Sequence, residues 1–270
     1  AWGQTYVATK LKPRGKEKDS WRILAAHDNT IVQTVPQQVP PKSLKKGEWF
    51  EFESDSIWHI DYGPVPLVND AGQVAFADYR YYAPRFLDDA LSTKIGWQLG
   101  IDTYRMPVDT EGGNFQGDGK GTCFTSERGL QYAGMTAEEF GDVWSSYQAC
   151  DTQLVVLKDI TDDGTGHIDM FFKLVDEENA IMGEYKDEYV EDAENKARMD
   201  DNATLLEGTT TASGGTYVVH RMPFPSKSDG TPRTYINSTF VNGVNLWPVY
   251  TDAQDAQAEA SQVWATAMAE

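Results

Sequence analysis

From Trp58 onward, short strand patterns alternate with helical patterns, and this alternation restricts the chain to the mixed α/β fold classes. The first strand pair is predicted at 66–68 and 74–81, on either side of an Asn-Asp-Ala-Gly turn. A helical pattern over 86–99 follows and ends at Gly100. The recurring unit is therefore a strand pair followed by a helix.

The same unit recurs, imperfectly, along the rest of the sequence. Thr136 begins a helix with a capping-box pattern, because Glu139 stands three residues after it. Further strands are predicted at 121–125, 154–157, 170–175, 180–185, 216–221, 234–240 and 244–249. Further helices are predicted at 136–150, 188–199 and from 252 onward.

Residues 1–53 have a different residue pattern, in which short runs of aromatic and β-branched residues alternate with turns. Strands are predicted there at 2–9, 21–26, 30–35 and 47–53. A loop interrupted by prolines at 36–41 separates the last two strands. We therefore expect two parts, a β-rich N-terminal segment at 1–53 and a larger domain at 54–270.

Acidic residues outnumber basic ones, 42 Asp and Glu against 23 Lys and Arg, which gives a formal net charge of −19. A nucleic-acid-binding protein needs positive charge along its contact surface, so this class is excluded. The negative charge can attract cationic ligands, but a need for solubility explains it equally well. No apolar run is long enough for a membrane span. Because the sequence begins at Ala1 rather than Met, we expect a removed signal peptide or an excised domain.

The sequence contains two cysteines, Cys123 and Cys150. Two thiols in a chain of this length are compatible with a disulfide and equally with a reducing compartment. No second His or Cys lies at the spacing of metal ligands from His167, so metal binding is the weaker option, and we expect no metal and no cofactor.

The segment Glu111-Gly-Gly-Asn-Phe-Gln-Gly-Asp-Gly-Lys-Gly-Thr contains the densest run of glycines. Such a run allows tight turns and a close approach of the backbone to a pocket. It is not a phosphate-binding loop, because it lacks the Lys-Ser/Thr ending and the helix that follows it. The alternative is a glycine-rich hairpin with solvated acids.

A second segment, Asp163-Gly-Thr-Gly-His-Ile-Asp, places His167 and Asp169 two residues apart at the start of a predicted strand. Alternate residues of a strand point to the same face, so we expect both side chains in one pocket. A histidine can act as a general acid and base, and a carboxylate beside it can bind a cationic group of a ligand. The alternative is a core or surface histidine that has no chemical role and whose hydrogen bonds are satisfied by its surroundings.

A third segment, Ile57-Trp58-His59-Ile60-Asp61-Tyr62-Gly63-Pro64, carries a carboxylate between aromatic residues and ahead of a turn. Alone, it is typical of a loop carboxylate flanked by hydrophobic anchors.

Taken in order, these motifs resemble those of the agmatine deiminase and bacterial peptidylarginine deiminase family. That family carries a Trp-x-x-Asp-x-Gly-Pro segment, a Glu-Gly-Gly-Asn segment, a Gly-His-x-Asp segment and a late Asn-Gly segment. The late segment is matched here by Asn237 and by Asn242-Gly243, and the resemblance covers about residues 54–270. It implies a five-bladed α/β propeller of the pentein type, here expected to be incomplete.

The resemblance also implies chemical roles. Asp61 and Asp169 match carboxylates that accept hydrogen bonds from a guanidinium group. His167 matches the residue that protonates the departing ammonia and then activates water. A cysteine thiolate is the expected nucleophile, but neither cysteine of this sequence stands at the family's position, so we expect the given chain to lack it. Ile60 replaces an arginine that the family usually carries before the aspartate.

The resemblance implies a small guanidinium substrate or peptidyl arginine. Arg80 and Arg85 fall where bacterial peptidylarginine deiminases grip a substrate carboxylate, which favours arginine or a C-terminal peptidyl arginine over agmatine. The alternative is a pair of surface or capping arginines. The other expected pocket residues are Trp58, Glu111, Asn114 and Asn237.

Residues 1–53 resemble, more weakly, a repeat of IgG-Fc-binding-like domains of bacterial surface proteins. This likeness rests on Trp2-Gly-Gln-Thr-Tyr-Val and Asp19-Ser-Trp-Arg-Ile-Leu-Ala-Ala. It implies an extracellular or cell-surface protein, with the cytoplasm as the alternative. A second hypothesis for function is a secreted binding or adhesion module that keeps the scaffold without the chemistry.

Overall fold

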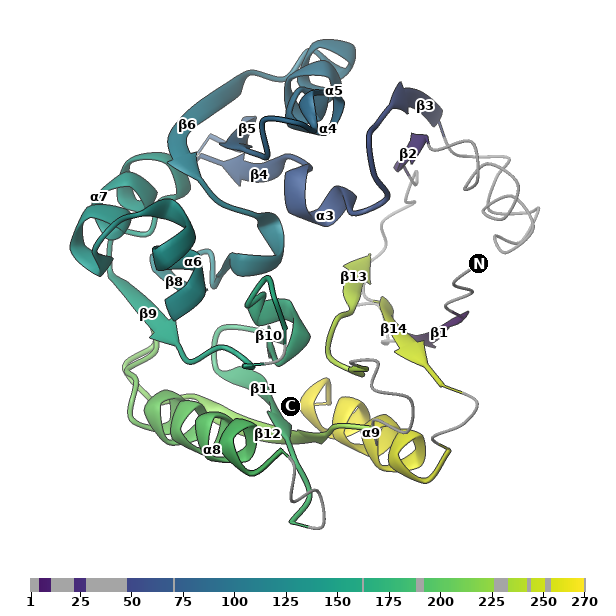
Figure 1. The fold of residues 1–270 in the computed structure, drawn as a ribbon, viewed down its shortest axis with the longest axis vertical. Helices are drawn as coiled ribbons and strands as arrows, with labels where there is room; N and C mark the ends of the chain where they lie inside the picture. The colour runs from purple at the N-terminus through teal and green to yellow at the C-terminus, as the bar shows by residue number, and fades with distance from the viewer. Residues whose placement is uncertain are drawn as a thin grey trace. The chain divides into compact units, whose positions relative to one another are not determined.

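The computed structural model describes residues 5–10, 22–27, 48–69, 71–161, 163–187, 192–225, 233–241, 244–250 and 254–269 (Figure 1). The chain divides into two compact units. One contains Arg14–Gly112, and the other contains Ala1–Pro13 together with Gly113–Glu270. The predicted strand at 30–35 and the Asn242-Gly243 motif lie outside the described residues.

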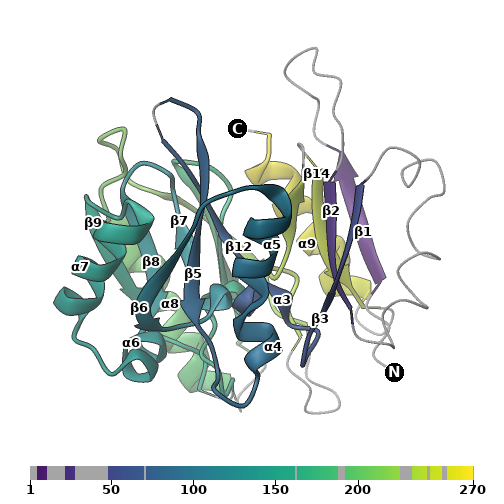
Figure 2. The ribbon, with the colours of Figure 1, turned by 90° about the horizontal axis from the view of Figure 1, so that it is seen from above.

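The described residues form a mixed α/β fold with five small sheets. In the unit Arg14–Gly112, β4 (Val65–Val68) pairs antiparallel with β5 (Val74–Arg80), and β5 pairs parallel with β6 (Thr103–Asp109). A parallel neighbour requires a crossover connection. Here α4 (Phe86–Asp89) and α5 (Leu91–Leu99) provide it, and α5 lies along β5 and β6 in Figure 2.

The same arrangement occurs twice more in the other unit. β7 (Gln116–Gly117), β8 (Thr122–Ser126) and β9 (Gln153–Leu157) form one sheet, with α6 (Glu127–Ala133) and α7 (Ala137–Gln148) as the crossover. β10 (Phe172–Leu174), β11 (Asn179–Glu184) and β12 (Val218–Pro223) form the next, with α8 (Ala193–Glu207) as the crossover. The repeated unit is therefore strand, strand, helix, strand, one strand longer than the sequence indicated.

The remaining two sheets depart from this pattern. β13 (Thr239–Val241) and β14 (Val244–Val249) form an antiparallel pair, and α9 (Gln254–Ala267) follows them. The third strand of that sheet is β1 (Thr5–Lys10), antiparallel to β14. β2 (Arg22–His27) and β3 (Glu48–Glu53) form a separate parallel pair.

Local signals explain several of these boundaries. In the β4–β5 turn, the Asn69 Oδ1 accepts hydrogen bonds from the backbone N of Ala71 at 3.0 Å and of Gln73 at 2.9 Å, while Gly72 adopts a positive φ of 74°. The capping box predicted at Thr136 is present, with both of its hydrogen bonds to Glu139.

Two predicted helices differ from the structure. The pattern over 86–99 is broken at Ala90 into α4 and α5, although Gly100 ends α5 as expected, with φ 67°. α8 begins at Ala193 and continues to Glu207, beyond the predicted end at residue 199. Asn202 explains the extension, because its buried amide exchanges two hydrogen bonds of 2.9 Å with the backbone of Lys158. Met199, Ala203 and Leu206 of the same helix are also buried in a core cluster, so α8 is held by apolar packing on one face as well as by these hydrogen bonds.

Further differences concern strands and a missed helix. β6, β7 and α6 are present but were not predicted. Of the predicted strand 234–240, only Thr239 and Phe240 lie in a strand, namely β13. The buried residues Tyr235 and Ile236 pack into a core cluster with Trp247 and Trp264 instead of entering the sheet.

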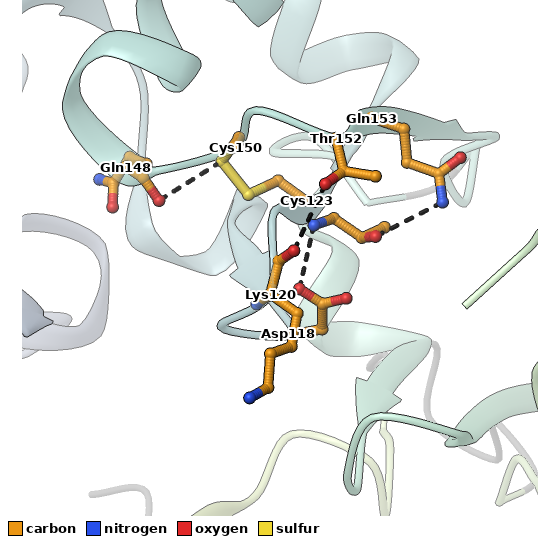
Figure 3. The surroundings of a disulfide bond; sticks show 8 residues. Asp118, Lys120, Cys123, Gln148, Cys150, Thr152 and Gln153 are labelled. Atoms are coloured by element: carbon orange, nitrogen blue, oxygen red, sulfur yellow. Dashed lines mark hydrogen bonds between the residues drawn. A yellow bond between two sulfur atoms is a disulfide. The ribbon is translucent and has the colours of Figure 1, made fainter. Parts of the chain in front are cut away.

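A disulfide joins Cys123, on β8, to Cys150, just after α7 (Figure 3). Both side chains are buried. The bond ties the crossover helix to the strand that it follows, so the two cysteines are structural. Within the described part of the chain, no helix combines the length and the apolar character needed to cross a bilayer.

The disulfide gives a prediction about stability. Replacing both Cys123 and Cys150 with alanine is expected to lower the free energy of unfolding by about 3–4 kcal/mol, because the bond closes a loop with a sequence separation of 27 residues. Urea unfolding with and without reductant measures this. Reductant should destabilise the unmodified protein and leave the double variant unchanged; equal stability of both proteins without reductant contradicts a structural role.

Candidate functional site

His167 and Asp169 lie on a tight turn rather than on a strand. His167 is the N-cap of η2, the 3-10 helix Ile168–Met170, and Asp169 is its middle residue, so the predicted strand at 170–175 begins only at Phe172. The reason is local, because Asp163 Oδ2 accepts a hydrogen bond from the backbone N of His167 at 3.1 Å and Gly166 has φ 65°. The strand geometry expected to align the two side chains was therefore wrong. Both are nevertheless buried, at 8% and 7% exposure.

The backbone of Gly113 lies directly against the imidazole ring of His167. A β-carbon at Gly113 would overlap His167 Nδ1 and lie 2.8 Å from Cγ and 2.9 Å from Cε1. No side chain fits there, which accounts for a glycine at this position of the Glu-Gly-Gly-Asn motif. Backbone and ring thus hold each other in place.

Asn114 fastens the loop that carries His167. Its Oδ1 accepts a hydrogen bond from Ser126 Oγ at 2.8 Å, and its Nδ2 donates to the carbonyl O of Thr165 at 3.4 Å. Ser126 also caps α6 by accepting a hydrogen bond from Gly129 N at 3.0 Å. Both ends of the buried Asn114 amide therefore contact protein groups, which suits a residue that shapes a site.

Asn237 and Lys173 lie beside the same turn. The Nδ2 of Asn237 contacts Met170 Sδ at 3.8 Å. Lys173 Nζ donates a hydrogen bond to the carbonyl O of Ser238 at 2.7 Å and lies 5.6 Å from the centre of the Phe240 ring. Burial lowers the pKa of Lys173, and the negative charge of Asp169 opposes that effect. Sequence reasoning missed Lys173, since a single lysine in an apolar strand resembles a solvated edge residue.

In the unit Arg14–Gly112, Asp61 and Glu111 are both buried, at 6% and 4% exposure. Asp61 lies on the short helix α3 (His59–Tyr62), where the sequence indicated a loop. Gly112 packs against the backbone of this helix, because a β-carbon there would overlap the carbonyl O of Ile60 and lie 3.6 Å from the Cα of Asp61. The first glycine of the motif thus lies against the backbone at Asp61, and the second lies against the ring of His167.

Tyr81 interacts electrostatically with these two carboxylates and accepts a hydrogen bond from Arg85. Burial raises the pKa of Tyr81, and the negative charges of Asp61 and Glu111 raise it further, whereas Arg85 lowers it. Arg85 Nη1 donates a hydrogen bond to Tyr81 Oη at 3.0 Å. The Arg85 guanidinium also lies 5.8 Å from the ring centre of Tyr81 and 5.4 Å from that of Tyr82. An aromatic residue at a strand end gives no sign of this role in the sequence.

The other predicted residues of this unit are exposed. Arg80 forms an ion pair with Asp109, with 3.1 Å between Nη2 and Oδ2, and both side chains are about half exposed. The Trp58 side chain, at 56% exposure, lies just before α3. The described residues hold no group of three His, Cys, Asp or Glu side chains that could bind a metal ion.

The structure thus distributes the predicted residues over both units. His167, Asp169, Asn114 and Asn237 belong to the unit that contains Gly113–Glu270. Asp61, Trp58, Arg80, Arg85 and Glu111 belong to the unit Arg14–Gly112.

Comparison with known proteins shows which protein family the chain resembles. Residues 15–269 match the family described as Porphyromonas-type peptidyl-arginine deiminase. An agmatine deiminase of Pseudomonas syringae pv. syringae is 26% identical over 253 residues, which cover 77% of this chain and 66% of the relative. An agmatine deiminase of Pseudomonas fluorescens is 28% identical over 251 residues, covering 78% of this chain and 67% of the relative. The chain spans 56% and 66% of the length of the first two curated relatives that it matches.

Solved structures agree in fold. The agmatine deiminase of Enterococcus faecalis superposes with a TM-score of 0.66 at 23% identity, covering 82% of this chain and 62% of that one. The agmatine deiminase of C. jejuni gives a TM-score of 0.69 at 18% identity, covering 90% and 72%. The chain belongs to the Porphyromonas-type peptidyl-arginine deiminase family, within the pentein superfamily, as its motifs indicated. The family match begins at residue 15 and so includes most of the segment 1–53; the proposed boundary at residue 53 stays a prediction.

The packing of Gly113 gives a prediction. Replacing Gly113 with alanine is expected to push the His167 ring out of place and lower stability by about 1–3 kcal/mol. Urea unfolding and the NMR signals of the His167 ring measure both effects. Gly141→Ala is the matched control, because a β-carbon at Gly141, inside α7, would come no closer than 3.9 Å to a neighbouring atom. If Gly113→Ala behaves like that control, the close packing is not a constraint.

Proposed function

We propose that this protein hydrolyses a guanidinium substrate, namely peptidyl arginine, arginine or agmatine, to a ureido product and ammonia. The observation that carries the proposal is the pair His167 and Asp169, both buried on one turn, with the His167 ring packed against the backbone of Gly113 in the Glu-Gly-Gly-Asn motif. Within the unit Arg14–Gly112, Gly112 packs against the backbone at Asp61, the other carboxylate that the family's motifs single out. We assign Asp61, His167 and Asp169 the roles that the family's motifs imply for them.

Each role follows from the charge of the substrate. Asp61 and Asp169 accept hydrogen bonds from the planar cation, because a carboxylate can receive two parallel N–H groups. A thiolate attacks the guanidinium carbon, and His167 donates a proton to the nitrogen that leaves as ammonia. His167 then takes a proton from water, which attacks the same carbon. The C–S bond breaks, the ureido product leaves and the thiolate is restored.

The nucleophile needs separate consideration. Cys123 and Cys150 are the two cysteines of the sequence, and both are joined in the disulfide. We therefore propose that the thiolate comes from residues outside these 270. The same observation favours the second candidate function, a binding module that holds an arginine-like ligand without turning it over.

The propeller implied by the family is also proposed. Its support is the strand, strand, helix, strand unit that occurs three times among the described residues, together with the β13–β14–α9 segment that begins a fourth. Export to an extracellular or surface location is proposed as well. A disulfide between buried cysteines supports it, because such bonds persist in oxidising compartments.

Turnover tests the function. In the natural protein, His167→Ala and Asp169→Asn are each expected to lower the rate by about 10²–10⁴-fold, because each removes a group needed in the chemical step. The assay follows ammonia with citrulline from arginine or peptidyl arginine, or with carbamoylputrescine from agmatine. Asp201→Asn, at an exposed carboxylate, is the control and should retain full activity.

The outcomes separate the two candidate functions. Unchanged turnover in both site variants refutes the assigned roles. A natural protein that binds arginine-like ligands but releases no ammonia is the binding module instead of the enzyme.

Substrate choice gives a further test. If Arg85 grips a substrate carboxylate, Arg85→Met should lower kcat/KM for arginine about 10–100-fold relative to agmatine, because one charge-assisted hydrogen bond is lost. Arg80→Met is the companion variant, with a smaller effect expected because Arg80 is paired with Asp109. An unchanged ratio of the two substrates in both variants excludes this carboxylate site.

A further inference from the structure

Arg128 lies in the first turn of α6, and its aliphatic stem packs against the loop that carries His167, within the same compact unit. A β-carbon at Gly166 would lie 2.6 Å from Arg128 Cβ, 2.7 Å from Cδ and 3.0 Å from Cγ. No side chain fits between the two residues, and Gly166 also has φ 65°, which favours glycine. The stem of Arg128 therefore bounds the backbone one residue before His167.

An ion pair holds the Arg128 side chain in this position. Its Nε donates a hydrogen bond to Asp159 Oδ2 at 3.0 Å, and the Asp159 side chain is only 8% exposed. Arg198, on α8, donates to the carbonyl O of Asp159 at 3.3 Å and brings its Nη1 within 3.7 Å of Oδ1. Helix stability does not explain Arg128, because the N-terminal turn of a helix disfavours a cation. Its location is explained instead by its contacts with Asp159 and with the loop.

The loop 163–167 determines its own shape but not its position in the unit. Asp163 accepts hydrogen bonds from the backbone N of Thr165 at 3.3 Å and of His167 at 3.1 Å, and these bonds stay within the loop. Contacts from outside must fix where the loop lies. Gly113 bounds the His167 ring, and Asn114 donates to the carbonyl O of Thr165 at 3.4 Å, a long hydrogen bond. Neither of these two contacts bounds the residue between Thr165 and His167.

We propose that Arg128 is a positioning residue for His167, because the ion pair with Asp159 holds its stem and the stem supports the backbone at Gly166. This inference rests on the proposed function, since it takes His167 as the proton donor to the departing ammonia. A small displacement of the ring would slow proton transfer, which needs hydrogen-bond reach, and would leave substrate binding by the carboxylates largely intact. The alternative is that Arg128 only stabilises the fold through its ion pair.

Steady-state turnover of the natural protein, together with NMR of its histidine ring signals, tests the inference. The signals of His167 are assigned by their absence from His167→Ala. Arg128→Ala removes both the stem and the charge, so the His167 signals should shift and kcat should fall by about 10–100-fold, while KM changes by less than about threefold. Arg128→Lys keeps the stem carbons and the charge and should restore kcat to within about threefold of the unmodified protein.

Two variants at the same carboxylate separate positioning from stability. Arg198→Met removes the other arginine that approaches Asp159, and the described ion pairs of Arg198 all lie outside the loop 163–167. The His167 signals and kcat should therefore stay unchanged in this variant. Asp159→Asn leaves Arg128 intact but removes the charge that holds it. It should shift the same signals and lower kcat by about 3–10-fold, even where Arg128→Ala folds poorly.

The outcomes distinguish this inference from the proposed function. A folded Arg128→Ala with wild-type kcat and wild-type His167 signals overturns the inference, and so does an equal fall of kcat in Arg198→Met. Where Arg128→Ala does not fold, wild-type behaviour of Asp159→Asn overturns it instead. If His167→Ala still loses turnover in these cases, the proposed function stands. Full turnover in His167→Ala refutes the proposed function and this inference with it.

Discussion

The close approach of the Gly113 backbone to the imidazole of His167 is the constraint on which the rest of the site depends. No β-carbon fits between them, so the ring has one side defined by main chain, which cannot rotate away as a side chain can. Gly112 repeats the arrangement against the backbone at Asp61. Within its own unit, each glycine thus lies against a residue that the family's motifs single out.

Buried hydrogen bonds extend this constraint outward. Asn114 follows the glycines and holds the carbonyl of Thr165, two residues before His167. Its other end accepts from Ser126, which also caps α6. The loop of the histidine is thus attached to a helix start through one amide. Side chains fixed in this way lose little further entropy when a ligand binds, which favours a preorganised site.

Charge is concentrated in the same two places. Asp61 and Glu111 are buried carboxylates whose charges raise the pKa of Tyr81, and Asp169 is a buried carboxylate whose charge opposes the effect of burial on the pKa of Lys173. Arg85 donates a hydrogen bond to Tyr81 in one unit, and Lys173 donates one to the Ser238 carbonyl in the other. Buried acids are costly unless a cation or hydrogen bonds compensate them.

The sequence alone determined the alternating α/β class, most strand positions, the capping box at Thr136 and the family, because turn residues, strand periodicity and ordered motifs are local signals. It could not decide that 3-10 geometry replaces a strand at His167, since that depends on how Asp163 bonds the backbone. Nor could it pair Cys123 with Cys150, extend α8 through Asn202, or reveal Tyr81 and Lys173. Those features arise from contacts between residues distant in sequence or from competition between local hydrogen bonds and strand formation. Only tertiary packing settles such contacts, because the same residues in another environment would remain solvated or pair differently.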